Sequence, residues 1–121
     1  MTDELVSEFE PIPLDAPASM WEILVPTMRQ DGRPIRTRFH RVWDEKVRAI
    51  SNGLTILPPT IGQWVSPIDE TLYKERMIPV RIMCTREQIE QIIDMTIDYY
   101  EQEAVLAYRV STECILRYAN D

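Results

Sequence analysis

Residues 76–102 read RMIPVRIMCTREQIEQIIDMTIDYYEQ, and this stretch contains a strand pattern that runs directly into a helix pattern. The first nine residues, 76–84, alternate between two faces, as in a β-strand. Thr85 and Gln88 then form a capping box, the pattern that opens a helix, and isoleucines recur at helical spacing over 86–102. The stretch therefore predicts a strand joined to an amphipathic helix with no loop between them.

The same order of strand and helix occurs once more, nearer the N-terminus. Residues 20–27 alternate between apolar and other side chains, which predicts a strand. Residues 37–51 carry one apolar stripe at helical spacing, which predicts a helix. Thr37 is the expected N-cap of this helix, and Gly53 is expected to end it in the left-handed conformation.

Three shorter segments complete the chain. Residues 54–57 are a short run of β-type residues, and 104–110 predict a last strand that 114–118 continue after a bulge near Ser111. Residues 58–75 predict a long hairpin, because the large apolar side chains in this connection need a surface to pack against.

The order of the predicted elements indicates the fold class. Strand, helix, strand, strand, helix, strand is the order of the split β-α-β fold. Each helix has one apolar stripe, and right-handed crossovers place both helices on the same face of the sheet. We therefore predict an α+β fold, a ferredoxin-like β-α-β-β-α-β two-layer sandwich with an antiparallel sheet. Pro79 conflicts with this pattern, because a proline in a central strand removes a ladder hydrogen bond; it predicts either a bulge or a different strand order.

The face of the sheet away from the helices is predicted to carry apolar side chains. By strand alternation it holds Leu24, Leu57, Met77 and Met83, which is too apolar for a face bathed in water. We expect a second copy of the chain to cover it, in a homo-oligomer that is most simply a dimer, because soluble proteins favour symmetric dimers. The N-terminal arm and a ligand remain alternative covers.

Size and charge limit the classes of function. A chain of 121 residues has the common size of one domain, and we expect an acidic, proline-containing arm over 1–18 and a single α+β domain over 19–121. The net charge of −7 and a pI of about 4.7 argue against nucleic-acid binding and against attraction to an anionic membrane surface. The sequence has neither an apolar run of membrane-spanning length nor a secretory signal, so a cytoplasmic location is expected.

Motifs of known chemistry are missing from the sequence. It has no glycine-rich phosphate loop, no Ser-His-Asp arrangement and no metal-ligand spacing, so we expect no cofactor and no metal. Cys84 and Cys114 are expected to be small buried side chains rather than a disulfide. His40, the only histidine, is expected to be structural or at the surface. An enzyme with Glu75 or His40 as its base remains an alternative that rests on analogy of fold.

Arginine is used unusually often. Eleven of the 13 basic residues are arginines, and seven basic residues lie within 29–48. Arginine forks bind carboxylates and phosphates, and the start of a helix adds a positive dipole end. The segment therefore predicts an anion or nucleotide site around Arg36, Arg38 and Arg41. The alternative interpretation is a solvated basic surface that pairs with the acidic arm.

A second candidate pocket follows from Arg81, which the alternation places on the face away from the helices. An arginine among apolar side chains needs a carboxylate partner, and Glu22 lies on the same predicted face. Together with Trp64 and Glu75, these two residues predict a small ligand pocket. An interfacial salt bridge beside a packing tryptophan is the alternative interpretation.

Four short motifs resemble a family of short bacterial proteins of unknown function. They are GLTIL at 53–57, GQW at 62–64, Glu75 before a strand and YEQEAVL at 100–106, within a match that covers 50–108. The family pattern is GLT, then GxW, a lone glutamate and Y-x-x-x-F-x-Q-x-S-V-L. The resemblance implies a ferredoxin-like fold.

The resemblance also points at Trp64, Glu75, Gln102 and Glu103 as site residues, but it brings no known activity. Proteins of that family usually carry an export signal, which this sequence lacks, and Ala104 stands where they have serine.

From these features we expect a non-catalytic, homo-oligomeric module that binds a partner or packs on itself. The first alternative is a binder, of a sequestering kind, for a small anionic metabolite or nucleotide held by the arginine-rich segment. The second alternative is a small enzyme with a carboxylate base.

Overall fold

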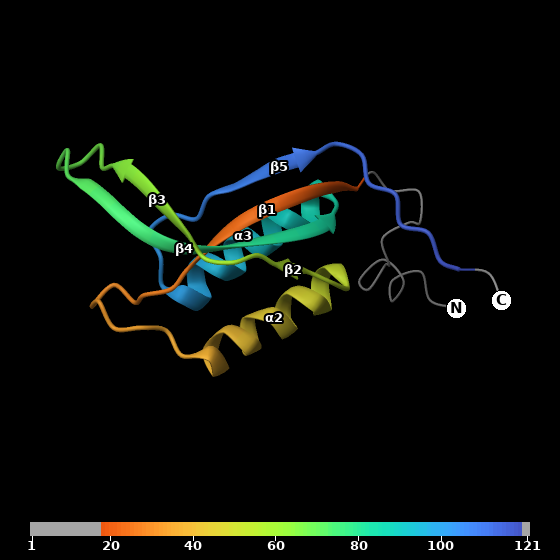
Figure 1. Ribbon diagram of the computed structural model, residues 1–121, viewed down its shortest axis with the longest axis horizontal. Helices are drawn as coiled ribbons and strands as arrows, with labels where there is room; N and C mark the ends of the chain where they lie inside the picture. Colours follow the sequence, from red (N-terminus) through yellow and green to blue (C-terminus); the bar gives the residue numbers. More distant parts are fainter. Residues whose placement is uncertain (1–17, 120–121) are drawn as a thin grey trace, which may run out of the picture.

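The computed structural model describes residues 18–119. The arm predicted over 1–18 therefore lies, apart from Ala18, outside the described residues, as do residues 120 and 121. Figure 1 shows the elements, which are β1 (Ser19–Pro26), α2 (Thr37–Ser51), β2 (Thr55–Ile56), β3 (Thr60–Val65), β4 (Leu72–Cys84), α3 (Arg86–Tyr100) and β5 (Ala107–Ser111).

The strands form an antiparallel sheet in the order β2-β4-β1-β5, and β3 pairs with β4 beyond the end of β2. Both helices lie against the same face of this sheet (Figure 1). The predicted ferredoxin-like two-layer sandwich is confirmed, with the second strand of the fold divided into β2 and β3.

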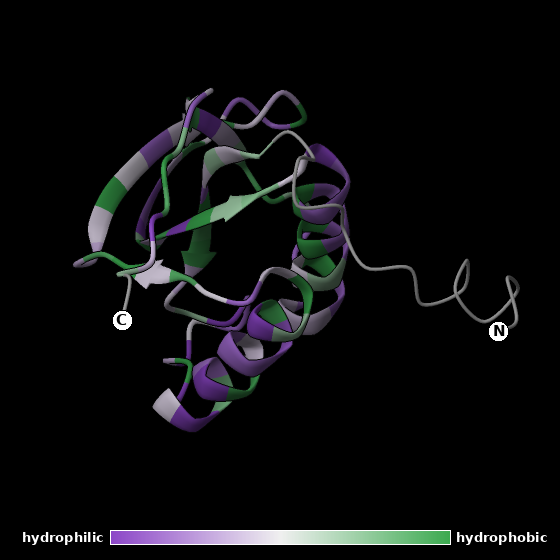
Figure 2. Ribbon diagram, turned by 90° about the vertical axis from the view of Figure 1, so that its right-hand side faces the viewer, coloured by the Kyte–Doolittle hydropathy of each residue, from purple (hydrophilic) through white to green (hydrophobic). Residues whose placement is uncertain are grey.

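The core fills the space between the sheet and the two helices. Alternate residues of β1 and β4 point into it, and the apolar stripes of the helices close it, while their outer turns are coloured hydrophilic in Figure 2. Trp43 donates its indole N–H to the Thr96 hydroxyl at 2.9 Å, so its polar atom is satisfied inside the core. The side chains with at most 2% exposure include Ile23, Val25, Val47, Val80, Ile82, Ile89 and Ile92.

The helix ends follow partly from the sequence. At the start of α3 the predicted capping box is present: the Gln88 N–H donates to the Thr85 hydroxyl at 3.2 Å, and the Thr85 N–H donates to the Gln88 side chain at 2.9 Å. The bounds of α2 are as predicted, but Thr37 is its first helical residue and Arg36 is the N-cap, with no side-chain cap. The left-handed residue at the other end is Asn52, with φ of 74°, and not Gly53. Asparagine tolerates this conformation better than most residues do.

Neither of the two predicted explanations for Pro79, a bulge or a different strand order, is correct. It pairs with Leu24 in an unbroken β1–β4 register, and the strand order is the expected one. Its carbonyl accepts the Leu57 N–H at 2.9 Å, so its nitrogen faces the same edge, towards β2. The edge strand is interrupted there, between Ile56 and Thr60, and little pairing is lost to the missing N–H.

The segment predicted as a hairpin is one, but its second strand is longer than expected. β4 begins at Leu72, four residues before the predicted start, and pairs with β3 from Leu72 to Met77. The last strand, β5, runs from Ala107 to Ser111, and a register shift opposite Met20 and Trp21 marks the predicted bulge. The predicted continuation over 114–118 is not a strand.

Candidate functional site

One face of the sheet has no helix against it in the described part of the chain, and we call it the open face. The register Glu22–Arg81, Leu24–Pro79 and Pro26–Met77 fixes which residues point to it. The four predicted apolar residues all belong there by position, and all are half-buried rather than fully exposed: Leu24, Leu57, Met77 and Met83. Their part in an interface remains a prediction.

A hydrogen-bonded cluster of three residues lies in the middle of the open face. Arg81 donates from Nε to Oε1 of Glu22 at 2.9 Å, and the Tyr108 hydroxyl donates to Oε2. The Glu22 side chain is only 9% exposed, whereas that of Arg81 is 45% exposed. The pairing of Glu22 with Arg81 is the one the sequence predicts.

The charge of Glu22 is stabilised by these two partners. Burial favours its neutral form, but the hydrogen bonds from Tyr108 and Arg81 outweigh burial and hold the pKa of Glu22 below its usual range. The hydrogen bond to Glu22 in turn raises the pKa of Tyr108. Both carboxylate oxygens thus have a donor, and the cluster can be covered by another surface without leaving Glu22 unpaired.

Tyr108 is the member of this cluster that sequence reasoning missed. The alternation in 104–110 places it on one face of a strand, but only the pairing of β5 with β1 brings it opposite Glu22. That pairing depends on contacts 86 residues apart, which no local pattern reveals.

The other two residues of the predicted pocket lie elsewhere on the same face. Trp64 pairs with Tyr73 across the hairpin, with ring centroids 4.9 Å apart and an angle of 19° between the planes. Glu75 lies opposite Gly62. Six residues of strand, about 20 Å, separate Glu75 from Arg81. The structure therefore does not bring the four residues into one pocket.

The hairpin of β3 and β4, residues 60–77, projects beyond the helices, and we call it the β3–β4 hairpin (Figure 1). Large apolar side chains are exposed on both of its faces and at its tip, since Trp64 and Tyr73 lie on the open-face side and Ile61, Val65 and Leu72 on the other. Ile68, at the tip, is 88% exposed. The β3–β4 hairpin therefore has exposed apolar surface that another molecule can contact.

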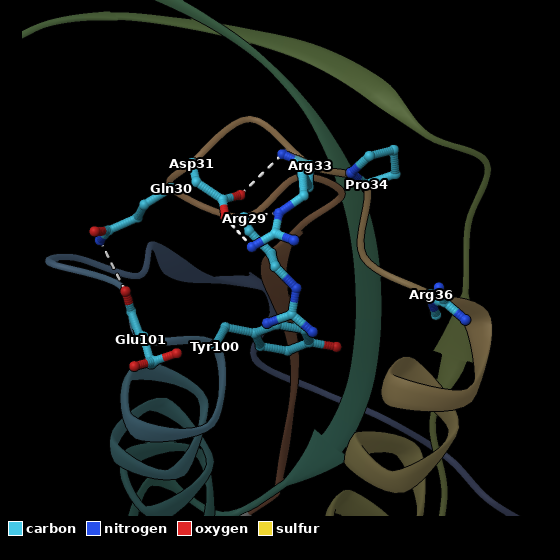
Figure 3. Close-up of a pocket in the computed structure, with 8 residues that line it drawn as sticks. All are labelled: Arg29, Gln30, Asp31, Arg33, Pro34, Arg36, Tyr100 and Glu101. Carbon is cyan, nitrogen blue, oxygen red and sulfur yellow. Dashed lines mark hydrogen bonds and ion pairs between the residues drawn. The ribbon is translucent and has the colours of Figure 1, made fainter.

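The arginine-rich segment borders a cleft of about 860 Å³ between the loop before α2 and the end of α3 (Figure 3). Gln30 donates to the Glu101 carbonyl at 2.8 Å and so fastens the loop to α3. The residues that line the cleft are Arg29, Gln30, Asp31, Arg33, Pro34, Arg36, Tyr100 and Glu101.

The arginines of this cleft are partly engaged already. Arg33 binds Asp31 through Nε at 2.8 Å and Nη2 at 2.7 Å, and the hydrogen bond from Arg33 lowers the pKa of Asp31. The guanidinium of Arg29 lies 4.8 Å from the centre of the Phe39 ring. Three arginines face two acids among the lining residues, so the formal excess is one positive charge.

Of the three arginines predicted for an anion site, the structure places only one at this cleft. Arg36 lines it, and Arg38 is exposed on α2. Arg41 lines a smaller groove under α2. Sequence reasoning missed Tyr100 and Glu101, which come from the end of the other helix.

The remaining reactive side chains are accounted for within residues 18–119. Cys84 and Cys114 are both free, and burial raises the pKa of Cys84 to about 12. His40 lies with its Nδ1 2.6 Å from the Tyr100 hydroxyl. No cluster of three side chains of the metal-binding kind occurs in this part of the chain, and no helix in it is both long and apolar enough to cross a bilayer.

Comparisons with known proteins find likeness in structure only. No protein-family model matches the chain, and no curated protein does. CutA1 from Oryza sativa superposes with a TM-score of 0.59 at 7% identity, covering 87% of this chain and 84% of that one. A phage SAM lyase in complex with S-methyl-5'-thioadenosine gives 0.59 at 12%, covering 84% and 86%. The periplasmic divalent cation tolerance protein CutA from Archaeoglobus fulgidus gives 0.57 at 11%, covering 83% and 88%. At these identities the likeness shows that this chain shares their fold.

Proposed function

We propose that the protein is a homo-oligomeric binding module in which a second copy of the chain covers the open face. The observation that carries this proposal is a carboxylate, Glu22, that is 9% exposed in the middle of a sheet face with no helix on it. Half-buried apolar side chains surround the cluster that Glu22 forms with Arg81 and Tyr108.

Covering this face would be energetically favourable. Leu106, which accepts the Leu24 N–H through its carbonyl at 3.1 Å, is 59% exposed, and Tyr108 is 39% exposed. Each square ångström of such apolar surface removed from water contributes about 25 cal/mol. The cost of burying the cluster is reduced, because Glu22 already accepts two hydrogen bonds and does not need water.

A second copy is the occupant that the described residues favour. The β3–β4 hairpin exposes apolar side chains on both faces, such as Trp64 at 45% and Val65 at 59%. It projects from the same sheet that carries the open face (Figure 1). Each chain thus has an uncovered sheet face and an exposed apolar hairpin, and a symmetric assembly can place the hairpin of one copy against the open face of another. The net charge of −7 opposes close approach, so association is expected to strengthen when salt screens the charges.

Light scattering on matched variants tests this proposal. We expect wild-type protein at micromolar concentration to have at least twice the mass of one 14.2 kDa chain. Leu106→Glu should return it to a single chain, because the new charge would have to be buried without a partner. Val42→Glu is the control, since Val42 is 39% exposed on α2, away from the open face. A wild-type monomer, or two variants that behave alike, would contradict the proposal.

A second candidate function is the binding of a small anionic metabolite or nucleotide in the arginine cleft. It is favoured by the position of Arg29 and Arg36 around one cleft, which offers guanidinium groups to an anion. The cleft also has the volume of a ligand site, at about 860 Å³. A structural neighbour that holds S-methyl-5'-thioadenosine is consistent with a nucleoside ligand on this fold.

Thermal unfolding with ATP and with citrate tests the second candidate. A ligand at 100 times its Kd should add about 2.7 kcal/mol to the free energy of unfolding. Arg36→Ala should remove most of this gain, and Arg38→Ala, which changes an exposed arginine outside the cleft, should preserve it. The candidate is lost if neither compound raises the unfolding temperature at millimolar concentration.

A further inference from the structure

A groove of about 310 Å³ lies on the helix side of the sheet, between α2 and the edge formed by β2. It exists because β2 has only two residues, so the edge beside α2 is covered incompletely and Ile56 is 54% exposed. The volume is at the lower end of the range for small-molecule sites. The lining residues are Val25, Thr37, His40, Arg41, Trp43, Asp44, Ile56, Ile78 and Val80.

Three titratable side chains of α2, His40, Arg41 and Asp44, line this groove together with Thr37 and apolar residues, and His40 and Asp44 lie one helical turn apart. Asp44 is half-buried; no hydrogen bond or ion pair to its carboxylate occurs within residues 18–119, although the charges of Arg48 and His40 favour its ionised form. Burial raises the pKa of Asp44 and lowers the pKa of His40. A half-buried carboxylate that bonds no protein donor has oxygens that can accept a hydrogen bond from a ligand N–H.

The hydrogen bond between His40 and Tyr100 joins the Tyr100 hydroxyl to Nδ1 of the imidazole, and the direction of this bond decides which ring nitrogen of His40 can donate. Burial raises the pKa of Tyr100, so its hydroxyl keeps its proton. His40 Nδ1, at 2.6 Å, is the acceptor that this hydroxyl meets among the described residues. We therefore assign Tyr100 as the donor to Nδ1; this assignment puts the proton of the neutral imidazole on Nε2 and makes Nε2 a donor.

We propose that this groove binds a flat heteroaromatic ring that carries an amino group next to a ring nitrogen. The amino group donates to the Asp44 carboxylate, and the ring nitrogen accepts from His40 Nε2. The ring itself lies against the aliphatic side chains of Ile56, Ile78 and Val80. The Watson–Crick edges of adenine and cytosine have this pattern, as do other aminoazines. The site is on the opposite side of the sheet from the open face, so it is independent of the proposed function.

Titration of the full-length protein, followed by NMR of its backbone amides, tests this site. The probes are 9-methyladenine and 1-methylcytosine, with 9-methylpurine as the matched ring that lacks the amino group. We expect the two amino compounds to shift the amides of residues around the groove, and 9-methylpurine to bind at least about tenfold more weakly, since a hydrogen bond to a charged group is lost.

Asp44→Asn should weaken the amino probes by about tenfold or more, and Glu45→Gln is its control on the exposed side of the same helix. Ile56→Trp fills the groove and should abolish binding while Asp44 is retained. The inference is overturned by any of three results: no shifts at millimolar probe, shifts that map to the arginine cleft, or equal affinity for the wild-type protein and Asp44→Asn.

Discussion

The two faces of β1 and β4 are made by alternate residues of the same strands, yet they differ in composition and in cover. On the helix side, Ile23, Val80 and Ile82 are at most 2% exposed, and apolar contact alone closes the layer. On the open face, half-buried Leu24 and Met83 share the surface with a hydrogen-bonded ion pair. The first face is a permanent core. The second has the mixture of apolar and paired polar groups that is typical of surfaces covered by another molecule.

The largest expected effect comes from truncating one side chain on each face. Ile82→Ala should lower the free energy of unfolding by about 2–5 kcal/mol, because it leaves a cavity in a closed core. Met83→Ala, the neighbouring residue on the open face, should cost less than about 1.5 kcal/mol in a dilute sample where copies are separate. Urea unfolding at low concentration measures both. Equal losses would mean that the open face is as closely packed as the core.

A smaller effect is expected from the buried carboxylate of the open face. Glu22→Gln should cost about 1–2 kcal/mol at pH 7, a value kept low because Arg81 is partly in water. The pKa of Glu22 is lower in the folded protein than its ordinary 4.5. Its stabilising effect is therefore complete above pH 4.5 and is lost as the pH falls through the folded value.

The pH dependence of urea unfolding between pH 7 and 3 checks this prediction. The difference between wild type and Glu22→Gln should shrink below about pH 4.5, whereas Glu45→Gln, which changes an exposed glutamate, should follow the wild-type curve. A difference that stays constant down to pH 3 would contradict the account of Glu22.

The smallest expected effect concerns an ion pair whose two side chains are both exposed to solvent. Arg86 and Glu90 form a salt bridge of 2.8 Å on α3, with side chains 73% and 60% exposed. Glu90→Gln should change the free energy of unfolding by less than about 0.5 kcal/mol. Urea unfolding measures the loss of unfolding free energy for Glu90→Gln and Glu22→Gln alike. Equal losses would show that the ion pair of the open face contributes no more to stability than an exposed one.

The parts of this molecule that the sequence could predict are those that depend on neighbouring residues. Alternation over 76–84, the capping box at Thr85 and the apolar stripe of α2 each lie within a few residues of chain. They sufficed for the fold class and for the face shared by Glu22 and Arg81.

The rest depends on pairings between distant segments. Tyr108 reaches Glu22 only because β5 pairs with β1, and Tyr100 reaches the arginine cleft only because α3 ends beside the loop before α2. Pro79 is tolerated because the edge strand breaks opposite it, just after Leu57, and no local pattern reveals this meeting of two separate segments. The predicted pocket failed for the same reason, since sharing a face does not fix the separation along a strand.

Methionine oxidation tests most directly whether another copy covers the open face. Met77 and Met83 lie on that face, and Met28, which is 46% exposed outside it, serves as the internal reference. With dilute peroxide and mass spectrometry, we expect Met77 and Met83 to be protected at micromolar concentration and to oxidise faster on dilution or in Leu106→Glu. Oxidation of Met77 and Met83 at rates that do not depend on protein concentration or on Leu106→Glu would contradict the account.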